Sequence, residues 1–585
     1  MEGLSAKAIG FDDANTRSLL PTDQQPYDGF LQAFLRAVWP GDSSPAIDRL
    51  KGSEYIGDYA KRLFEIPIRQ DTHTKRTLLE KHHPMTIVEP TRKIDPRGTT
   101  EYFDVAIVGA GISGIAAARH LNEQCPDLSY VILETQESFG GTWLTHKYPG
   151  IRSDSDLHTY GYSFKPWVGP PIATAEEIRR YMGEVIDENS ISSHIRYHHR
   201  IDTGAWSTPD KRWVLEATRT DTGEKLRFSC NFLWMAQGYY RHSEGYTPKW
   251  PGMADFKGQI VHPQTWDPKL DIKGRRVVVI GSGATAATVI PAMTDKAVHV
   301  TMLQRSPTYF RTGRNAIEIA EELRRLQIDE HWIHEIVRRK ILYEQAQFTK
   351  RTFAEPDNVK RELLDNVRAY LGPDYDVETH FTPTYRPRRQ RIAFIPDADL
   401  FKDIAAGKAS VVTDEIERFI ADGIRLKSGK VLGADIIVTA TGFHMSVMGD
   451  IDFAIDGKKL DWAQTVSYRG MMFTGVPNLA WFFGYFRGSW TLRSDLIGDF
   501  VCKLMNHMKA KGVRQVTPQL RAEDNNMPLL PFIDGENFNP GYLNRALHLL
   551  PKRGDKPEWM HNQDYWTEKD EIPRTNLDDA AFGYS

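Results

Sequence analysis

The sequence is poor in cysteine, has no long hydrophobic run and carries little excess charge. Its 585 residues include three cysteines, Cys125, Cys230 and Cys502, far apart and with neither a CxxC pair nor metal-ligand spacing. This pattern argues against a metal site and a redox-active disulfide, and it favours a reducing compartment. The net charge of −3 gives no electrostatic reason to bind nucleic acid or an anionic membrane surface.

Targeting signals are also missing from the sequence. The start, Met1-Glu-Gly-Leu-Ser, lacks the basic and apolar regions of a signal peptide. The sequence contains no run of about eighteen apolar residues, which is the length needed to span a membrane. We therefore expect a cytoplasmic protein without a transmembrane segment, and the sequence leaves homo-oligomerisation open. At this length the chain should form two or three domains.

Two glycine-rich turns each follow an apolar, β-branched run and precede a helix-forming stretch. The first turn contains Gly109, Gly111, Ser113 and Gly114, and the second contains Gly281, Ser282, Gly283, Ala284, Thr285 and Ala286. In a strand, turn and helix of this kind, the glycines allow the bend and the close approach of a diphosphate, which the helix N-terminus favours. Each turn therefore predicts a dinucleotide site.

The strand after each turn distinguishes the two sites. Glu134 ends the run 130–133, twenty residues beyond Gly114, where its carboxylate would accept hydrogen bonds from ribose hydroxyls. Arg305 and Ser306 follow the run 299–303, and a guanidinium there would pair with a ribose phosphate. The first site therefore predicts FAD or NAD, and the second predicts NADP. Together they indicate a tightly held flavin that NADPH reduces.

These motifs predict an α/β fold with two dinucleotide-binding, Rossmann-like domains, the NADP domain lying within a discontinuous FAD domain. We expect a partly helical N-terminal extension at 1–100, the FAD domain at 101–241 and 432–585 with a C-terminal segment, and the NADP domain at 242–431 with a helical insert at about 313–370. The strand 435–440 is expected to return to the FAD domain. In the extension, 30–39 and 53–64 predict helices that pack on the body or at a subunit interface, with a regulatory or targeting role as the alternative.

The segment between the two turns carries a more specific pattern. Phe256, Gly258, His262 and Trp266 match FxGxxxHxxxW, and Asp267 follows as the pattern allows. This segment resembles the fingerprint of Baeyer–Villiger monooxygenases. Within that family the chain is most similar to the ethionamide-activating monooxygenases, over about 102–510. The supporting segments are 141–143, 148–156, 281–287, 303–307, 390–391, 440–442 and 489–492.

The resemblance implies an enzyme that uses FAD, NADPH and O2 to convert ketones to esters or lactones through a flavin peroxide, with sulfide oxygenation as a further capability. One alternative is a flavin monooxygenase for nitrogen or sulfur, whose linker pattern lacks the terminal tryptophan. The other is an NADPH oxidase-like or noncatalytic flavoprotein. Disulfide reductases are disfavoured because they relay electrons through a cysteine pair.

The resemblance also implies the catalytic residues. Arg391 matches the family's arginine, whose permanent charge would stabilise an anionic oxidant and adduct; the alternative is one basic residue among several on a solvated surface. Asp154 would orient this guanidinium and touch the flavin, with Asp156 as its rival. His262 is expected to act as a hinge and not as an acid or base.

The remaining predicted residues line the cofactors and the substrate. Gly141, Thr142 and Trp143 should lie along the flavin, although Trp143 could equally be core, and Arg152 and Ile201 complete the cofactor set. Trp490 would line a substrate cavity or be a structural tryptophan. The chain departs from the family pattern at Arg388, Arg389, Phe486 and Arg487. Because these changes lie toward the substrate side, they affect the expected substrate preference more than the chemistry.

Overall fold

The computed structural model describes residues 93–94, 100–535 and 538–585, so the helices expected at 30–39 and 53–64 lie outside the described residues. The chain divides into two compact units, one of residues 1–91 with 318–340 and one of residues 92–317 with 341–585. The described part of the first unit holds α11 (Glu318–Arg325) and the start of α12 (Glu330–Ala354). The two sheets that organise the fold belong to the second unit.

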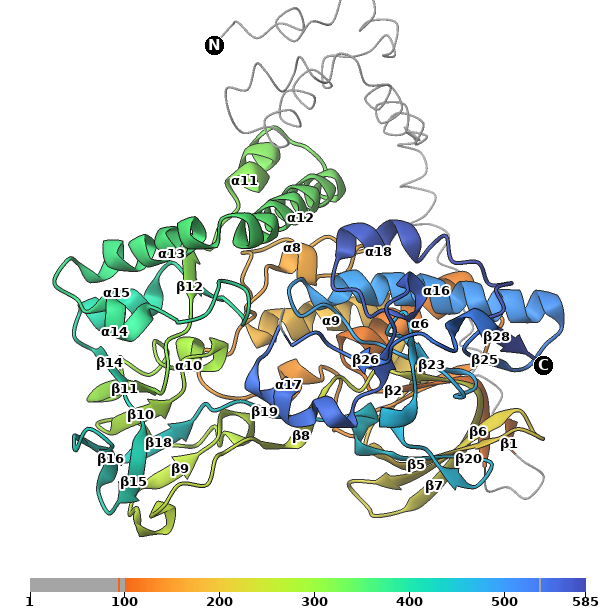
Figure 1. The fold of residues 1–585 in the computed structure, drawn as a ribbon, viewed down its shortest axis with the longest axis horizontal. Coiled ribbons are helices and arrows are strands. Elements are labelled where there is room, and N and C mark those ends of the chain that lie inside the picture. Colours follow the sequence, from red (N-terminus) through yellow and green to blue (C-terminus); the bar gives the residue numbers. More distant parts are fainter. Residues whose placement is uncertain (1–92, 95–99, 536–537) are drawn as a thin grey trace, which may run out of the picture. The chain divides into compact units, whose positions relative to one another are not determined.

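The first sheet has ten strands in the order β21-β20-β5-β6-β7-β2-β3-β4, with β1 beside β2 and β24 beside β7 (Figure 1). Its central strand β2 (Glu101–Val108) runs parallel to both β3 and β7, and its residues 105–108 are buried. Such continuous burial is expected of a parallel strand covered on both faces. The other strands are β1 (Lys93–Ile94), β3 (Tyr130–Leu133), β4 (Ile195–Arg196), β5 (His199–Ser207), β6 (Arg212–Arg219), β7 (Lys225–Met235), β20 (Asp452–Ile455), β21 (Lys458–Lys459) and β24 (Leu479–Trp481).

Helices α6 (Ile112–Gln124) and α16 (Trp490–Lys511) pack against each other beside the first sheet (Figure 1). Together with α9 (Ala175–Glu188) they share one hydrophobic core with Ile107 of β2. Val108, the next residue, belongs to a second core on the opposite face of the sheet. Shorter helices complete this half of the fold: α7 (Thr142–Thr145), α8 (Leu157–Tyr160), α17 (Gly541–Ala546) and α18 (Tyr565–Glu571).

The second sheet has five parallel strands in the order β14-β11-β10-β18-β9. These strands are β14 (Ala409–Thr413), β11 (His299–Gln304), β10 (Arg276–Ile280), β18 (Ile436–Thr439) and β9 (Gln259–Val261). Four helices accompany the sheet: α10 (Ala284–Val289), α13 (Pro356–Leu371), α14 (Val377–Phe381) and α15 (Asp399–Ala405). The stretch 313–370 is largely helical because it contains α11, α12 and most of α13.

The place of β18 corrects the expected domain boundary. We predicted that the strand 435–440 returns to the first domain, but Ile436 and its neighbours pair in parallel with β10 of the second sheet. The prediction is wrong because a fully apolar run fits the centre of either parallel sheet, and periodicity alone does not assign it. The chain returns to the first sheet with β20, which pairs with β5, and with β24, which pairs with β7. The second domain therefore extends beyond residue 431 and includes β18.

The chain passes between the two sheets twice, and the two passages lie side by side. β8 (Tyr240–Gly245) leads away from the first sheet, and β19 (Phe443–Met445) leads back and pairs with β8 in an antiparallel ribbon. Smaller sheets join the remaining segments: β12 (Phe310–Gly313), β13 (Ala393–Pro396), β15 (Ile416–Ile420), β16 (Gly423–Leu426), β17 (Val431–Gly433), β22 (Ser467–Tyr468), β23 (Met472–Phe473), β25 (Val516–Pro518), β26 (Leu530–Pro531), β27 (Lys552–Arg553) and β28 (Phe582–Tyr584).

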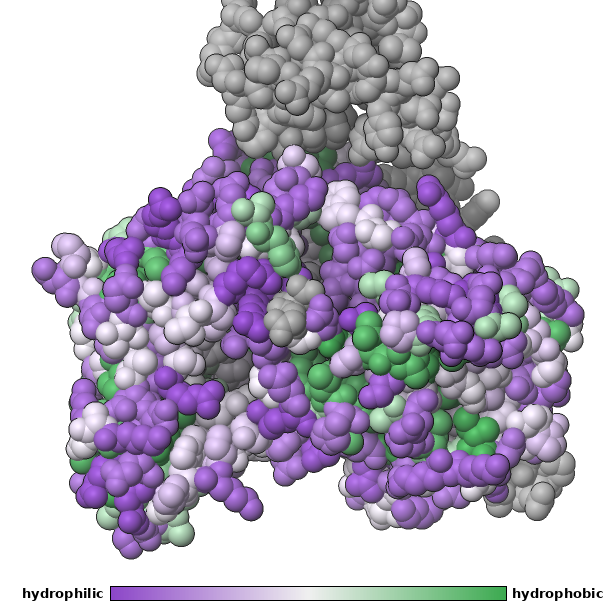
Figure 2. All heavy atoms as spheres, in the orientation of Figure 1, coloured by the Kyte–Doolittle hydropathy of each residue, from purple (hydrophilic) through white to green (hydrophobic). Residues whose placement is uncertain are grey.

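Hydrophilic residues cover most of the face in Figure 2. Hydrophobic residues gather around the position of β26 (Leu530–Pro531) in this view, and Leu529, the residue before β26, is about half exposed. Among the described residues, no helix combines the length and the apolar character needed to cross a bilayer.

Candidate functional site

The first glycine turn joins β2 to α6. Gly109 has a φ of +103°, which favours glycine, and a Cβ on Gly114 would lie 1.9 Å from the Gly109 carbonyl oxygen. Glu134 braces the turn, because its carboxylate accepts the Ala110 N–H at 2.7 Å and the Gln136 N–H at 2.8 Å. Burial raises the pKa of Glu134. Ser113 lies buried in the first turn of α6, a thirteen-residue helix whose N-terminus follows directly on the glycine backbone.

Gly140 and Gly141, which directly precede α7, lie close to this turn. A Cβ on Gly141 would lie 3.1 Å from the Gly111 Cα, so the two backbones can approach this closely only without side chains. Thr142, which begins α7, is exposed, whereas Trp143 is partly buried and donates from Nε1 to the Tyr160 hydroxyl at 3.0 Å. The bare backbone and the helix N-terminus therefore fit the diphosphate of a dinucleotide.

The second glycine turn joins β10 to α10. Gly281 has a φ of +128°, and no heavy atom lies within 4 Å of a Cβ placed on Gly283. The Ser282 hydroxyl lies 2.8 Å from that of Thr308 and donates to the Ser306 carbonyl at 3.3 Å. Of the other predicted residues here, Ala286 is buried in the core, Ala284 and Thr285 are half-buried, and Arg305 is exposed beyond β11. This open turn also fits a dinucleotide.

Arg391 and Asp154 meet although 237 residues separate them in the sequence. The Arg391 Nη1 donates to the Asp154 Oδ2, and the two side chains are 44% and 28% exposed. The Asp154 charge raises the pKa of Arg391 well above its usual range. The Arg391 guanidinium therefore stays protonated, and the Asp154 carboxylate holds its orientation. The rival Asp156 instead caps α8, accepting the Thr159 N–H at 2.8 Å.

Four tyrosines that were not predicted from the sequence surround this pair: Tyr160, Tyr239, Tyr240 and Tyr542. Burial raises the pKa of Tyr160, Tyr240 and Tyr542, so these hydroxyls stay neutral at physiological pH. The available signal was the position of Tyr239 and Tyr240 just beyond β7, where parallel strands end and ligands bind. Nothing in the sequence pointed to Tyr542, because it lies far along the C-terminal segment.

Trp490 lies between the first glycine turn and the tyrosines. Its Nε1 donates to the Ser113 hydroxyl at 2.8 Å, and its ring stacks on Tyr239 with centroids 5.1 Å apart. Trp490 also begins α16, so this contact ties the start of α16 to the first turn of α6. The indole is therefore held in place at the edge of the candidate site.

Two residues predicted to bind cofactor have other partners. Arg152 donates twice to the Asp399 carboxylate, at 2.5 and 3.2 Å, and so links the segment after the first turn to α15. Ile201 is a residue of β5, is 7% exposed and packs in the core on one face of the first sheet.

The fingerprint residues attach the linker to the edge of the second sheet. Phe256 and Trp266 are both buried, but they pack in different cores on opposite faces of that sheet. A Cβ on Gly258 would lie 2.3 Å from the Asp435 carbonyl oxygen, so the linker runs close to the start of β18. The fingerprint thus fixes β9 as an edge strand.

His262 has both ring nitrogens engaged by backbone. Its Nδ1 accepts the Gln264 N–H at 3.1 Å, so its Nε2 carries the proton and donates to the Gly442 carbonyl at 3.1 Å. Burial lowers the pKa of His262. A neutral imidazole fixed by two backbone groups fits a hinge and not a general acid or base.

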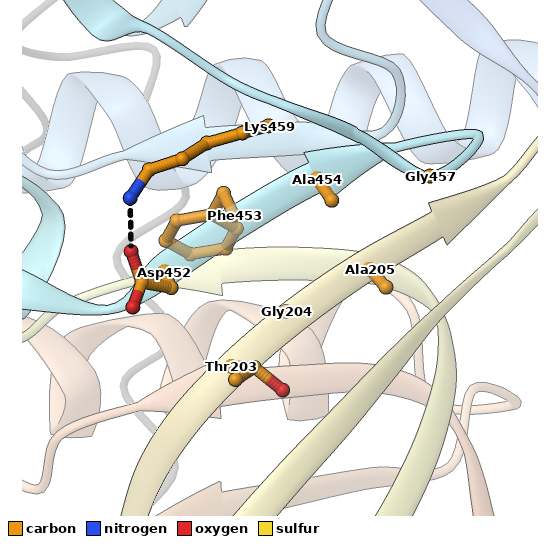
Figure 3. A pocket seen from close by; sticks show the side chains of 8 residues that line it. All are labelled: Thr203, Gly204, Ala205, Asp452, Phe453, Ala454, Gly457 and Lys459. Atoms are coloured by element: carbon orange, nitrogen blue, oxygen red, sulfur yellow. Dashed lines mark hydrogen bonds and ion pairs between the residues drawn. The ribbon is translucent and has the colours of Figure 1, made fainter.

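Two further pockets lie away from Arg391. One, of about 350 Å³, lies against the paired strands β5 and β20 and the start of β21, and its charged residues Asp452 and Lys459 pair with each other at 2.9 Å (Figure 3). The other, of about 250 Å³, includes the Arg152–Asp399 ion pair. Neither pocket is lined by the candidate catalytic residues.

Comparison with known proteins identifies the fold and the family of this chain. A family model described as pyridine nucleotide-disulphide oxidoreductase matches residues 103–374. Steroid monooxygenase bound to NADP has the same fold, with a TM-score of 0.65 and 22% identity, covering 83% of this chain and 99% of that chain. Cyclohexanone monooxygenase bound to ε-caprolactone has a TM-score of 0.63 and 19% identity, covering 83% and 100%.

A relative with higher identity establishes the family. The FAD-containing monooxygenase EthA of Mycobacterium tuberculosis is 44% identical over 488 residues, which are 83% of this chain and 98% of that protein. Cys125, Cys230 and Cys502 are all free and buried. This chain belongs to the family of FAD-containing monooxygenases.

Proposed function

We propose that this protein is a Baeyer–Villiger monooxygenase that uses FAD, NADPH and O2 to convert ketones to esters or lactones. The observation that carries the proposal is the Arg391–Asp154 pair, which lies among partly buried tyrosines. The fingerprint from Phe256 to Trp266 and the fold shared with steroid and cyclohexanone monooxygenases support it.

The two glycine turns divide the cofactors between them. FAD binds at the first turn, where Glu134 and the bare backbone of Gly111 and Gly141 meet. NADPH binds at the second turn, with Arg305 and Ser306 toward its ribose phosphate. When bound, FAD takes reducing equivalents from NADPH and activates O2.

The chain's own residues act on the ketone. The Arg391 guanidinium stabilises the negative charge that develops on the carbonyl oxygen as the carbon becomes tetrahedral, and removing one such donor costs enzymes about 10²- to 10³-fold in rate. Asp154 keeps the guanidinium oriented. The tyrosine and tryptophan rings cover part of the reacting centre and so limit its contact with water.

The test supplies the FAD-loaded enzyme with NADPH, O2 and either a linear ketone or a sulfide of the same length. We expect ester to form in proportion to the NADPH consumed. Sulfoxide without ester would instead identify a heteroatom monooxygenase. Hydrogen peroxide without any oxygenated product would identify an oxidase-like flavoprotein.

A further inference from the structure

Four arginines from three chain segments gather around two phenylalanine rings of α12. We call them the arginine cluster: Arg311, Arg386, Arg388 and Arg487. The guanidinium carbons of Arg311 and Arg388 each lie 5.5 Å from the centre of the Phe348 ring. Those of Arg386 and Arg487 lie 4.1 and 5.6 Å from the centre of the Phe353 ring. The cluster therefore places four positively charged guanidinium groups beside the apolar surface of two phenylalanine rings.

Arg388 is held by two hydrogen bonds. Its Nη1 donates to the Thr349 hydroxyl at 2.8 Å and to the Arg487 carbonyl at 3.0 Å. Its φ of +64° lies in the left-handed region, which a β-carbon disfavours. Contacts with α12 and with the segment before α16 therefore hold this side chain at a costly backbone position.

The like charges of the cluster oppose one another. Burial, together with the charges of Arg487 and Arg311, lowers the pKa of Arg388 to about 10. Burial also lowers the pKa of Arg386 and of Arg487, each with a further contribution from a neighbouring arginine, while Asp534 partly offsets the effect at Arg487. The like charges around Arg388, which is partly withdrawn from solvent, favour an incoming anion at this position.

The cluster lies close to the proposed catalytic residues along the chain. Arg388 precedes Arg391 by three residues, and Arg487 precedes Trp490 by three. Three residues span at most about 10 Å, so one molecule can contact both Arg391 and the cluster. Positions 388 and 487 are also among those where this sequence departs from the pattern of the Baeyer–Villiger monooxygenases that it resembles.

We propose that the arginine cluster binds a carboxylate of the substrate, so that the preferred ketone carries an apolar chain ending in an anionic group. The inference rests on the proposed function, since it places the ketone at Arg391. Guanidinium groups suit this role because they bind a carboxylate through two parallel hydrogen bonds. Phe348 and Phe353 supply apolar surface for the adjoining chain.

The experiment compares an oxo-carboxylic acid of medium chain length with its methyl ester, which has the same chain and carbonyl position but no charge. For the parent enzyme we expect kcat/KM to be about tenfold or more higher for the acid than for the ester. The difference should lie mainly in KM, because one charge-assisted hydrogen bond strengthens binding by about tenfold. Equal oxidation of both would overturn the inference and leave the proposed function intact. Oxidation of neither would count against the proposed function itself.

Arg388→Gln tests the site directly. We expect the acid-to-ester ratio of kcat/KM to fall toward one, and Arg311→Gln should lower it in the same direction. Arg425→Gln, at an exposed arginine of β16, is the matched control and should keep the parent ratio. If Arg388→Gln raised the KM for NADPH and kept the acid-to-ester ratio, the cluster would bind a dinucleotide phosphate, and the inference would be wrong.

Discussion

At the scale of single residues, the contact between Arg391 and Asp154 makes the sharpest prediction. Arg391→Lys keeps a positive charge but loses the planar fork that the carboxylate holds, so we expect product formation to fall by about 10²-fold. Asp154→Asn keeps the shape and loses the charge that raises the pKa of Arg391, so a smaller fall of about tenfold is expected. Turnover with a ketone, at matched FAD content, measures both effects.

Asp156→Asn is the matched control for this prediction. Asp156 lies two residues from Asp154 but caps α8, and asparagine caps helices about as well as aspartate. This variant should turn over ketone at close to the parent rate. Equal losses at positions 154 and 156 would mean that the Asp154 contact has no special role.

At the scale of helices, one buried ion pair connects α16 to α18. Arg493 is 0% exposed and its Nε lies 2.7 Å from the Glu568 carboxylate, which is 2% exposed and also accepts from the Tyr485 hydroxyl at 2.6 Å. Glu568→Gln leaves a buried cation without its counter-charge, so we expect the free energy of unfolding to fall by about 3–5 kcal/mol. Glu571→Gln, on the same helix, removes a 41% exposed carboxylate and should cost less than about 1 kcal/mol. The measurement is urea unfolding of the two FAD-loaded variants. If both lost the same free energy of unfolding, burial would not decide the cost of removing a carboxylate.

The junction between α6 and α16 predicts a pH dependence. Burial lowers the pKa of His120, but Asp495 and Asp499 of α16 outweigh burial and raise it to about 9. A histidine with a raised pKa binds its proton more tightly in the folded state. Its contribution is therefore fully present below about pH 6.5 and is lost as the pH rises through about 9. Because Asp499 is more than half exposed, we expect a loss of about 1–3 kcal/mol.

Unfolding measurements at a series of pH values test this junction. The parent should lose stability between pH 6.5 and 9, and His120→Gln should remove that part of the slope. His548→Gln changes an exposed histidine and should retain the parent profile. A parent curve that is flat in this window would show that His120 is not held protonated.

At the scale of the whole molecule, local patterns predicted more than contacts between distant segments. Both glycine turns follow buried strands, as expected, because strand, turn and helix are adjacent in the sequence. The sheet that contains β18 could not be assigned from the sequence, since its apolar run is compatible with either sheet. Tyr542 was missed because its approach to Arg391 depends on the path of the C-terminal segment. Long-range packing therefore completes the candidate site.

The ribbon of β8 and β19 connects the two sheets, and His262 holds it from the linker side through Gly442. A Cβ on Gly245 would lie 1.9 Å from the His262 ring, so Gly245→Ala must displace the imidazole. His262→Asn can still accept the Gln264 N–H but is too short to reach Gly442 as well. Because both changes loosen the passage between the two sheets, we expect the oxygenated product formed per NADPH to fall several-fold at unchanged FAD content.

The Gly313→Ala variant separates this effect from a general cost of added side chains. A Cβ at Gly313 meets only an ordinary contact, 3.7 Å from the Phe394 ring, and its φ is not in the left-handed region. Its product yield per NADPH should therefore equal that of the parent. If Gly245→Ala and His262→Asn also kept the parent yield, the ribbon would serve only to connect the sheets. If both lowered it while NADPH still reduced the flavin at the parent rate, the His262 contact would be needed after reduction, when the two halves must hold the substrate and both cofactors together.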